Sequence, residues 1–294
     1  MNKNTKILVT GVKGQLGFDC LRELKKRGYI NVLGIDIEDL DITNKTAVFK
    51  YIEKYQPDVV LHNAAWTAVD KAEEFKQKVF DINANGPKYI AEACKMVGAK
   101  MVYISTDYVF NGEGNTPFEV DDETNGLSTY GRTKLLGEIN VKSTIKNYFI
   151  VRVSWVFGIN GNNFVKTMLG LAKAGKTELN IVSDQIGSPT YTVDLANLLC
   201  DMIETEKYGT YHATNEGFIS WADFAEEIFK ESNSNVKVNR VSTEQYMKLV
   251  LNQTNRPLNS RLSKKSLDKA GFKRLPSWKS ALTRYLKELK ESNF

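Results

Sequence analysis

Short apolar runs alternate with helical patterns through the first half of this 294-residue chain, and this alternation is the strongest limit on its fold. An apolar run at 6–10 precedes helical spacing at 16–26, and a second run follows at 32–36. Each later run follows another helix-like stretch; these runs span 58–62, 100–105 and 148–153. Short strands that alternate with helices indicate a parallel sheet with helices on both faces. The predicted class is therefore α/β, a doubly wound parallel sheet.

The pattern becomes looser after about residue 155. Helical spacing recurs there, and residues 210–213 form a candidate strand; the helical stretches are 163–173, 192–204 and 221–230. No internal repeat or long linker is evident. We expect residues 1–155 to form the sheet domain, with part of about 185–215 returning to it, and 156–294 to form mainly a smaller C-terminal lobe.

Composition narrows the class of protein. With 42% hydrophobic and 26% charged residues, 20 Gly and 6 Pro, the chain resembles an ordinary globular protein rather than a disordered or collagen-like one. No apolar run approaches the roughly 18 residues of a membrane span, and the run at 7–9 is too short for a signal-peptide core. The expectation is a cytoplasmic protein without membrane contact.

Cysteine and charge placement argue against two further classes. Cys20, Cys94 and Cys200 are too few and too widely spaced for a disulfide framework or a metal motif, and are expected to be buried thiols. Residues 232–294 hold 14 Lys and Arg against 4 Asp and Glu. This basic segment fits a solvated surface or contact with phosphates, but no aromatic residues alternate with the charges as in a nucleic-acid-binding stripe. We therefore expect no nucleic-acid partner.

The first functional signal is a glycine pattern where the first predicted strand meets the first helix. Gly11, Gly14 and Gly17 lie between a predicted strand and a predicted helix. In dinucleotide-binding folds the backbone at this place approaches the pyrophosphate, and the helix N-terminus offsets the negative charge of the pyrophosphate. A tight strand-to-helix turn without a ligand is the alternative explanation of such glycines. Asp36, at the end of the second strand, favours the dinucleotide, because a carboxylate there accepts hydrogen bonds from ribose hydroxyls. It favours NADH over NADPH, although Lys13 in the turn partly compensates, so both cofactors stay open.

The second signal is a tyrosine four residues before a lysine. Tyr130 and Lys134 share one face of a predicted helix. An ammonium near a phenol lowers the phenol pKa toward working pH, which suits a general acid for a ketone oxygen. The same spacing is also common on helix surfaces. Thr106 strengthens the functional interpretation, because it follows a predicted strand at the sheet edge where such folds bind ligands.

These motifs together resemble the extended short-chain dehydrogenases/reductases, with a Rossmann-type sheet. More specific stretches resemble the dTDP-4-dehydrorhamnose reductase family over residues 6 to about 290. They are Ala65-Trp-Thr-Ala-Val-Asp-Lys-Ala-Glu73, Ser105-Thr-Asp-Tyr-Val-Phe110, Arg152-Val-Ser-Trp-Val156, Gly161-Asn-Asn-Phe164, Asp184-Gln185, Gly187-Ser-Pro-Thr190 and Arg256-Pro-Leu-Asn-Ser-Arg-Leu262. The resemblance implies reduction of the 4-keto group of a dTDP-linked sugar, dTDP-4-dehydro-L-rhamnose, for a cell-surface polysaccharide. It implies NADPH or NADH as reductant and allows a homodimer.

The resemblance also implies a role for individual residues. Tyr130 would donate the proton, Lys134 would hold the nicotinamide ribose, and Thr106 would bind the substrate oxygen. Asp107 and Trp155 would contact the sugar. The residues that would bind the dinucleotide, besides Tyr130 and Lys134, are Gly11, Gly14, Gln15, Leu16, Gly17, Asp36, Ile37, Asp41, Ile42, Ala64, Ala65 and Trp66. Trp66 differs from the His or Tyr that is more familiar at that position in the family.

Several alternatives stay open. His62 is expected to be a strand-end histidine rather than a catalytic base, and His212 to be structural. Asp19, Glu23 and Asp194 are acids of the kind that hold a divalent ion at a subunit contact in some relatives, but no metal is predicted. Arg256 fits either a phosphate contact or a structural turn, and Trp221 and Trp278 are expected in the core.

Two other activities also fit the motifs. Nucleotide-sugar epimerases and dehydratases use the same Thr, Tyr and Lys, although dehydratases usually carry an acid pair where this chain has Asp107-Tyr108. A non-catalytic regulatory subunit that binds a dinucleotide is the other alternative. It would be expected to have lost part of the trio, which is intact here.

Overall fold

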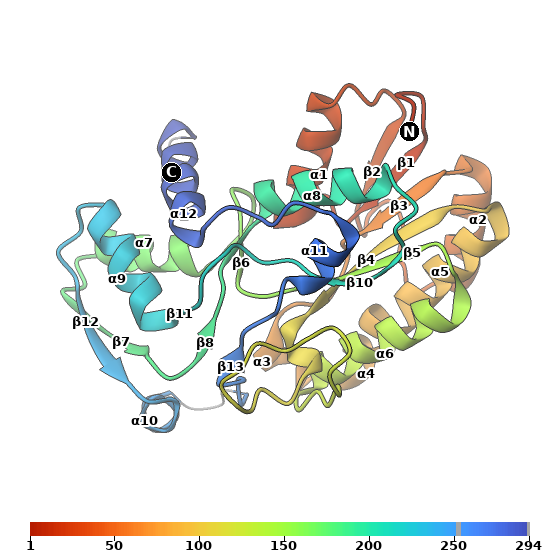
Figure 1. The fold of residues 1–294 in the computed structure, drawn as a ribbon. Coiled ribbons are helices and arrows are strands. Elements are labelled where there is room, and N and C mark those ends of the chain that lie inside the picture. The colour runs from red at the N-terminus through yellow and green to blue at the C-terminus, as the bar shows by residue number, and fades with distance from the viewer. Residues whose placement is uncertain (251–253, 293–294) are drawn as a thin grey trace.

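A six-stranded parallel sheet forms the larger part of the computed structural model, which describes residues 1–250 and 254–292 (Figure 1). Its strand order is β10 (Gly209–His212), β5 (Tyr148–Val153), β4 (Lys100–Thr106), β3 (Val59–His62), β1 (Ile7–Thr10) and β2 (Val32–Ile35). Every neighbouring pair is parallel. The predicted α/β class is confirmed, and the five early strands begin and end within one residue of their predicted bounds.

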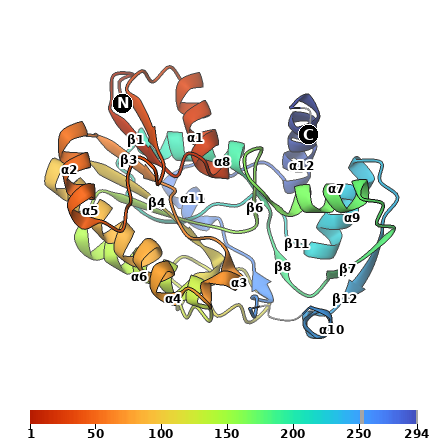
Figure 2. The ribbon, with the colours of Figure 1, turned by 180° about the vertical axis from the view of Figure 1, so that it is seen from behind.

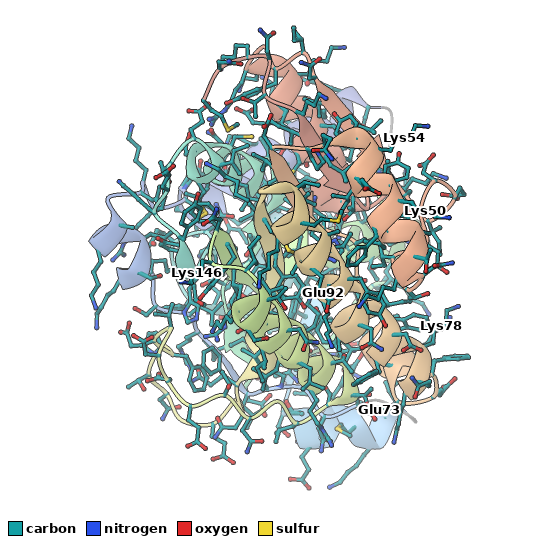
Figure 3. The ribbon with its side chains drawn as sticks, turned by 90° about the vertical axis from the view of Figure 1, so that its right-hand side faces the viewer. Lys50, Lys54, Glu73, Lys78, Glu92 and Lys146 are labelled. Atoms are coloured by element: carbon teal, nitrogen blue, oxygen red, sulfur yellow. The ribbon has the colours of Figure 1, made fainter. Side chains whose placement is uncertain are left out.

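Helices cover both faces of this sheet because its strands are apolar on both sides. Ile7 and Val9 pack into one buried cluster with α1 (Gln15–Lys26) and α8 (Thr192–Ile203). Leu8, between them, points to the other face and its cluster. The helices on that second face are α2 (Lys45–Tyr55), α5 (Gly86–Val97) and α6 (Thr129–Thr144). Figure 3 looks onto this helical layer, with Lys50 and Lys54 on its outer surface.

A smaller lobe stands beside the sheet domain, at the left in Figure 1 and the right in Figure 2. Its helices are α7 (Phe164–Lys173), α9 (Trp221–Glu231), α10 (Thr243–Leu249) and α12 (Trp278–Glu291). Its strands are β6 (Val156–Phe157), β7 (Glu178–Val182), β8 (Ile186–Gly187), β9 (Thr190–Tyr191), β11 (Ile219–Ser220), β12 (Lys237–Val241) and β13 (Asn259–Ser260). Its aromatic core includes Trp278, as predicted.

The chain returns from the lobe to the sheet domain. Helix α8 covers the sheet beside α1, β10 pairs with β5, and α11 (Lys265–Ala270) follows. The division of the chain near residue 155 stays a prediction. The remaining short elements are α3 (Val69–Ala72), α4 (Lys76–Phe80), a π-helical turn at Asp81–Asn85 and a 3-10 turn at Asp107–Val109.

The structure bears on two expectations from the sequence, one about the cysteines and one about membrane spans. The three cysteines are free and buried, as predicted. Within residues 1–250 and 254–292, no helix is long and apolar enough to cross a membrane.

Candidate active site

The carboxyl ends of four neighbouring strands carry most of the predicted site residues. Gly11 follows β1, Ala64 follows β3, Thr106 ends β4 and Trp155 follows β5. The connections reverse direction between β1 and β3, because β2 lies on one side of β1 and β4 lies beyond β3. Such a reversal leaves a crevice at the strand ends, where open parallel sheets bind ligands.

The glycine turn is built so that side chains are excluded. Gly11 has φ +69°, and a Cβ there would lie 2.8 Å from the backbone nitrogen of Ala64. A Cβ on Gly17 would lie 2.2 Å from the Gly11 carbonyl oxygen. Gly14 is the N-cap of α1, whose first amides face the turn. The backbone of the turn is therefore packed too closely for side chains at Gly11 and Gly17, and its position before α1 fits a dinucleotide pyrophosphate.

Asp36 is tied to the glycine turn by its carboxylate. Its two oxygens accept hydrogen bonds from the backbone nitrogens of Lys13 (2.8 Å) and Ile37 (2.9 Å). The Lys13 ammonium forms an exposed ion pair with Glu38 at 2.7 Å. Asp36 therefore lies beside the turn, as a ribose-binding carboxylate would, and the compensating lysine is paired with an acid.

Other residues predicted to bind the dinucleotide are buried in the cores or make polar contacts within the protein. The side chains of Leu16 and Ile42 are buried in the two cores, so any contact they make with a ligand comes from backbone. Asp41 accepts hydrogen bonds from Thr43 and starts the turn before α2. Gln15 accepts a hydrogen bond from the Gly158 amide at 2.9 Å, which joins the glycine turn to the lobe.

A buried asparagine holds the segment after β3. The Asn83 side chain accepts from the Trp66 amide at 2.8 Å and donates to the Trp66 carbonyl oxygen at 3.0 Å. Asn83 lies in the π-helical turn at 81–85, a distortion that recurs at functional sites. It fixes Trp66, while the Ala64 amide donates to the Thr10 hydroxyl at 3.2 Å. The Trp66 ring itself packs on Phe75.

Tyr130 is positioned by the way α6 begins. The Ser128 hydroxyl caps the helix by accepting from the Gly131 amide at 3.0 Å. Glu73, from the segment after α3, accepts from both the amide and the hydroxyl of Thr129 at 2.7 Å. The first turn of α6, and with it Tyr130, is therefore anchored at the crevice. Glu73 is labelled at the lower end of the helical layer in Figure 3.

Lys134 enters the protein interior because α6 packs very closely on β4. A Cβ on Gly137 would lie 2.2 Å from the Tyr103 hydroxyl oxygen, so only glycine allows this approach. The Lys134 ammonium, 3% exposed as a residue, donates to the Ile104 carbonyl oxygen at 2.6 Å and lies 4.1 Å from the Tyr103 ring centre. Burial lowers the pKa of Lys134 to about 7.

The expected effect of Lys134 on Tyr130 is not what the structure shows. Burial raises the pKa of Tyr130 above its ordinary value of 10, and a hydrogen bond with Thr106 opposes the rise. The lysine does not lower it, because its own pKa is depressed and its ammonium is directed at a β4 carbonyl. The prediction that Lys134 brings the phenol toward neutral pH is therefore wrong for this structure.

Thr106 and Asp107 complete the polar end of β4. The Thr106 hydroxyl donates to Asp107 Oδ1 at 2.9 Å and accepts from the Tyr108 amide at 3.2 Å. It also hydrogen-bonds with Tyr130, so Thr106 joins the phenol to the carboxylate. Burial raises the pKa of Asp107 to about 6, while hydrogen bonds from Thr106 and Ser260 oppose the rise.

Trp155 lies on the lobe side of the same crevice. Its backbone has φ +50°, a conformation that is uncommon for any residue other than glycine. Its ring stacks on Trp221 at 3.7 Å between ring centres. A Cβ on Gly187 would touch both Trp155 and Ser260, and Ser260 in turn contacts Asp107. Trp155 and Asp107 are therefore connected through Gly187 and Ser260, although they follow different strands.

The two histidines and the acids hold structural contacts. His62 shares a hydrogen bond with the Thr10 hydroxyl at 2.9 Å, and burial lowers its pKa to about 3, which confirms a strand-end histidine. His212 is buried beside Arg152. Arg284 binds both oxygens of Asp194 at 2.7 Å, and Thr192 hydrogen-bonds with Asp19. Among the described residues no group of three potential metal ligands gathers.

Sequence reasoning missed the contacts of Arg256 with Asp70 and Tyr108 at the crevice. Arg256 donates to Asp70 at 2.9 Å and hydrogen-bonds with Tyr108. The Tyr108 ring packs edge-on against Tyr130 at 5.5 Å between ring centres. The resemblance had drawn attention to Arg256, but nothing in local periodicity identifies its partners.

The comparisons with known proteins agree with this geometry. The model of the RmlD substrate binding domain family matches residues 5–291. The chain is 43% identical to the spore coat polysaccharide biosynthesis protein SpsK of Bacillus subtilis, over 97% of this chain and 98% of the other. It is 39% identical to a dTDP-4-dehydrorhamnose reductase of Aggregatibacter actinomycetemcomitans, over 94% and 97% of the two chains.

Solved structures extend the comparison to the fold. A dTDP-4-dehydrorhamnose reductase from Clostridium acetobutylicum superposes with a TM-score of 0.93 at 45% identity, over 97% of this chain and 100% of the other. One from Bacillus anthracis, in complex with NADP, has a TM-score of 0.92 at 41% identity, over 97% and 99%. The chain therefore belongs to the dTDP-4-dehydrorhamnose reductase family, a family of NAD(P)-dependent oxidoreductases.

Proposed function

We propose that this protein reduces the 4-keto group of dTDP-4-dehydro-L-rhamnose to give dTDP-L-rhamnose, with NADPH or NADH as reductant. The observation that carries the proposal is the cluster of Thr106, Tyr130 and Lys134 at the carboxyl end of β4, beside a glycine turn that fits a pyrophosphate. The names of relatives that align with nearly the whole chain support the choice of this substrate. The product would serve polysaccharide synthesis.

The residues divide the work according to their positions. The backbone from Gly11 to Gly17 would hold the pyrophosphate, and Asp36 the adenosine ribose. When bound, the reduced nicotinamide supplies a hydride for the C4 carbon. Tyr130 gives its phenolic proton to the C4 oxygen, and Lys134, at the same helix face, hydrogen-bonds the nicotinamide ribose. Its depressed pKa lets Lys134 gain or release a proton near neutral pH.

Thr106 and Asp107 orient the sugar. Thr106 already hydrogen-bonds with Tyr130, so a carbonyl oxygen that replaces one of its contacts would lie within reach of the phenol. Asp107 offers a buried carboxylate for a sugar hydroxyl, and Trp155 closes the lobe side of the crevice. Burial around these groups excludes water and strengthens their interactions with developing charge.

The experiment is a turnover assay with purified protein. Loss of reduced-nicotinamide absorbance is followed with dTDP-4-dehydrorhamnose and either NADPH or NADH. We expect consumption by the natural protein and a fall of about 10² to 10⁴ in turnover for Tyr130→Phe, with dinucleotide affinity nearly unchanged. Unchanged turnover in Tyr130→Phe would remove the phenol from the mechanism.

A second candidate is reduction of another nucleotide-linked 4-keto sugar. It is favoured by the 43% identity with SpsK, whose name specifies a spore coat polysaccharide and no substrate. Dinucleotide consumption with a different keto sugar, and none with the rhamnose precursor, would select this candidate. Dinucleotide binding without consumption of any keto sugar would instead support a regulatory subunit.

A further inference from the structure

A short segment of the lobe crosses to the sheet domain next to the catalytic tyrosine. Residues 254–258, here called the strap, lie between α10 and β13 in the chain. Both ribbon views place β13 beside α3 of the sheet domain (Figures 1 and 2). The strap contacts Asp70 and Gly112, and its Arg256 also contacts Tyr108.

Asp70 of α3 ties the strap to the sheet domain. Its Oδ1 accepts from the Thr254 amide at 3.0 Å, and its Oδ2 accepts from the Arg256 guanidinium at 2.9 Å. The pair is partly shielded, with Arg256 33% and Asp70 39% exposed. Asp70 thus binds the strap backbone and orients the guanidinium with one carboxylate.

Two further contacts fix the end of the strap. Pro257 packs so tightly on Gly112 that a Cβ there would lie 2.3 Å from the proline Cβ. The Asn259 amide donates to the Gly112 carbonyl oxygen at 2.9 Å, and its side chain donates to the Thr116 carbonyl oxygen at 2.9 Å. The strap is therefore held at both ends. The Arg256 side chain has a defined position because Asp70 binds it.

Tyr108 is held by its backbone carbonyl group and by its side-chain hydroxyl. Its backbone carbonyl oxygen lies where a Cβ on Gly126 or Gly131 would be, at 2.9 and 2.2 Å, so the main chain fits between these glycines. Its hydroxyl hydrogen-bonds with Arg256. Between these two points the ring meets Tyr130 edge-on, with 77° between the ring planes.

We infer that Arg256 is a positioning residue, which acts through Tyr108 to hold Tyr130 against Thr106 in the geometry that proton transfer needs. The inference rests on the proposed function, because Tyr130 must be the proton donor. It assigns Arg256 a role that neither a phosphate contact nor a plain structural turn provides. Small displacements of a reacting group lower rates strongly, so the effect falls on turnover rather than on substrate binding.

The test is a double-variant cycle with Arg256→Met and Tyr108→Phe. Tyr108→Phe removes one hydroxyl and keeps the ring, so it tests the contact even if Arg256→Met loosens the strap. Each single variant should lower kcat about tenfold with little change in KM for the sugar nucleotide. The double variant should lose no more than either single variant, because both break one contact. Arg256→Lys, which retains a donor, should recover part of the loss.

The matched control is Arg240→Met. Arg240 is another ion-paired arginine of the lobe, bound to Asp223 and Glu226 and away from the crevice, so kcat should not change. Full kcat in Tyr108→Phe, or losses that multiply in the double variant, would overturn the inference. A rise in KM confined to Arg256→Met would overturn it in favour of a phosphate contact.

A readout without turnover separates this inference from the proposed function. If the natural protein consumes no dinucleotide with any keto sugar, the proposed function fails. Hydrogen exchange at the Tyr108 amide, which donates to Thr106, then decides the positioning role. Faster exchange in both single variants and not in Arg240→Met would support it, and unchanged exchange would contradict it.

Discussion

Replacing the buried lysine of the site should make the protein more stable while it abolishes activity. Lys134 is 3% exposed, and the nearby carboxylate of Glu138 is paired with Arg152 at 2.8 Å. The pKa of Lys134 falls from 10.5 to about 7 because burial disfavours the ammonium. At about 1.36 kcal/mol for each pKa unit, this shift destabilises the folded state by about 4 kcal/mol near pH 7.

Lys134→Met removes that destabilisation and loses two contacts. The hydrogen bond to the Ile104 carbonyl oxygen is worth about 1 to 2 kcal/mol, counting the oxygen left without a partner. The contact with the Tyr103 ring is worth about 1 kcal/mol. The net expectation is a gain of about 1 to 2 kcal/mol in the free energy of unfolding near pH 7.

The pH dependence identifies the cause. Between the folded pKa near 7 and the unfolded value of 10.5, the unfolded chain binds more protons, so the stability of the natural protein rises with pH in this window. The stability difference between Lys134→Met and the natural protein should therefore fall by about 3 kcal/mol between about pH 7 and about pH 9.5, so that the gain near pH 7 becomes a loss of about 1 to 2 kcal/mol. Below about pH 7 the advantage should be largest.

Urea unfolding of both proteins at the two pH values is the assay. Lys146→Met serves as control, since Lys146 is exposed just beyond α6 and is labelled at the surface in Figure 3. This control should change stability little, and equally at both pH values. A stability difference for Lys134→Met that stays constant with pH, or a loss of stability near pH 7, would refute the reasoning.

Three further predictions concern neighbouring parts of the site. Asp36→Ala should shift the kcat/KM preference toward NADPH, because the carboxylate that excludes a 2′-phosphate is lost; an unchanged ratio counts against the ribose role. Gly17→Ala should lower stability by about 3 kcal/mol and weaken dinucleotide binding, measured by calorimetry, whereas Gly170→Ala, with open space around it, should not. Asp107→Asn should remove an acidic limb near pH 6 from the rate profile; a limb that persists belongs to another group.

Local sequence patterns were enough for the sheet and for the residues at its edge. The strands 7–10, 59–62 and 100–106 are short, apolar and followed by small or polar residues, so both their existence and their carboxyl ends can be read from the chain. The glycine turn could be predicted for the same reason, because backbone approach permits only glycine at Gly11 and Gly17.

Contacts between distant segments could not be predicted in this way. Arg256 and Asp70 are 186 residues apart, and the Trp155–Trp221 stack joins two elements with no shared periodicity. The burial of Lys134 could not be predicted either. Its spacing to Tyr130 does not reveal how closely α6 packs on β4, which depends on Gly137. Burial, rather than residue type, decided the pKa values of both catalytic candidates.

The central claim is net hydride transfer to the sugar C4 carbon, and isotope transfer tests it most directly. The natural protein is incubated with dTDP-4-dehydrorhamnose and a reduced dinucleotide that carries deuterium at the transferable position, and the sugar product is analysed by NMR. The account predicts one deuterium at C4 of dTDP-L-rhamnose for each dinucleotide consumed. A product without deuterium at C4, as expected of an epimerase that re-reduces its substrate with a retained cofactor, would contradict the account.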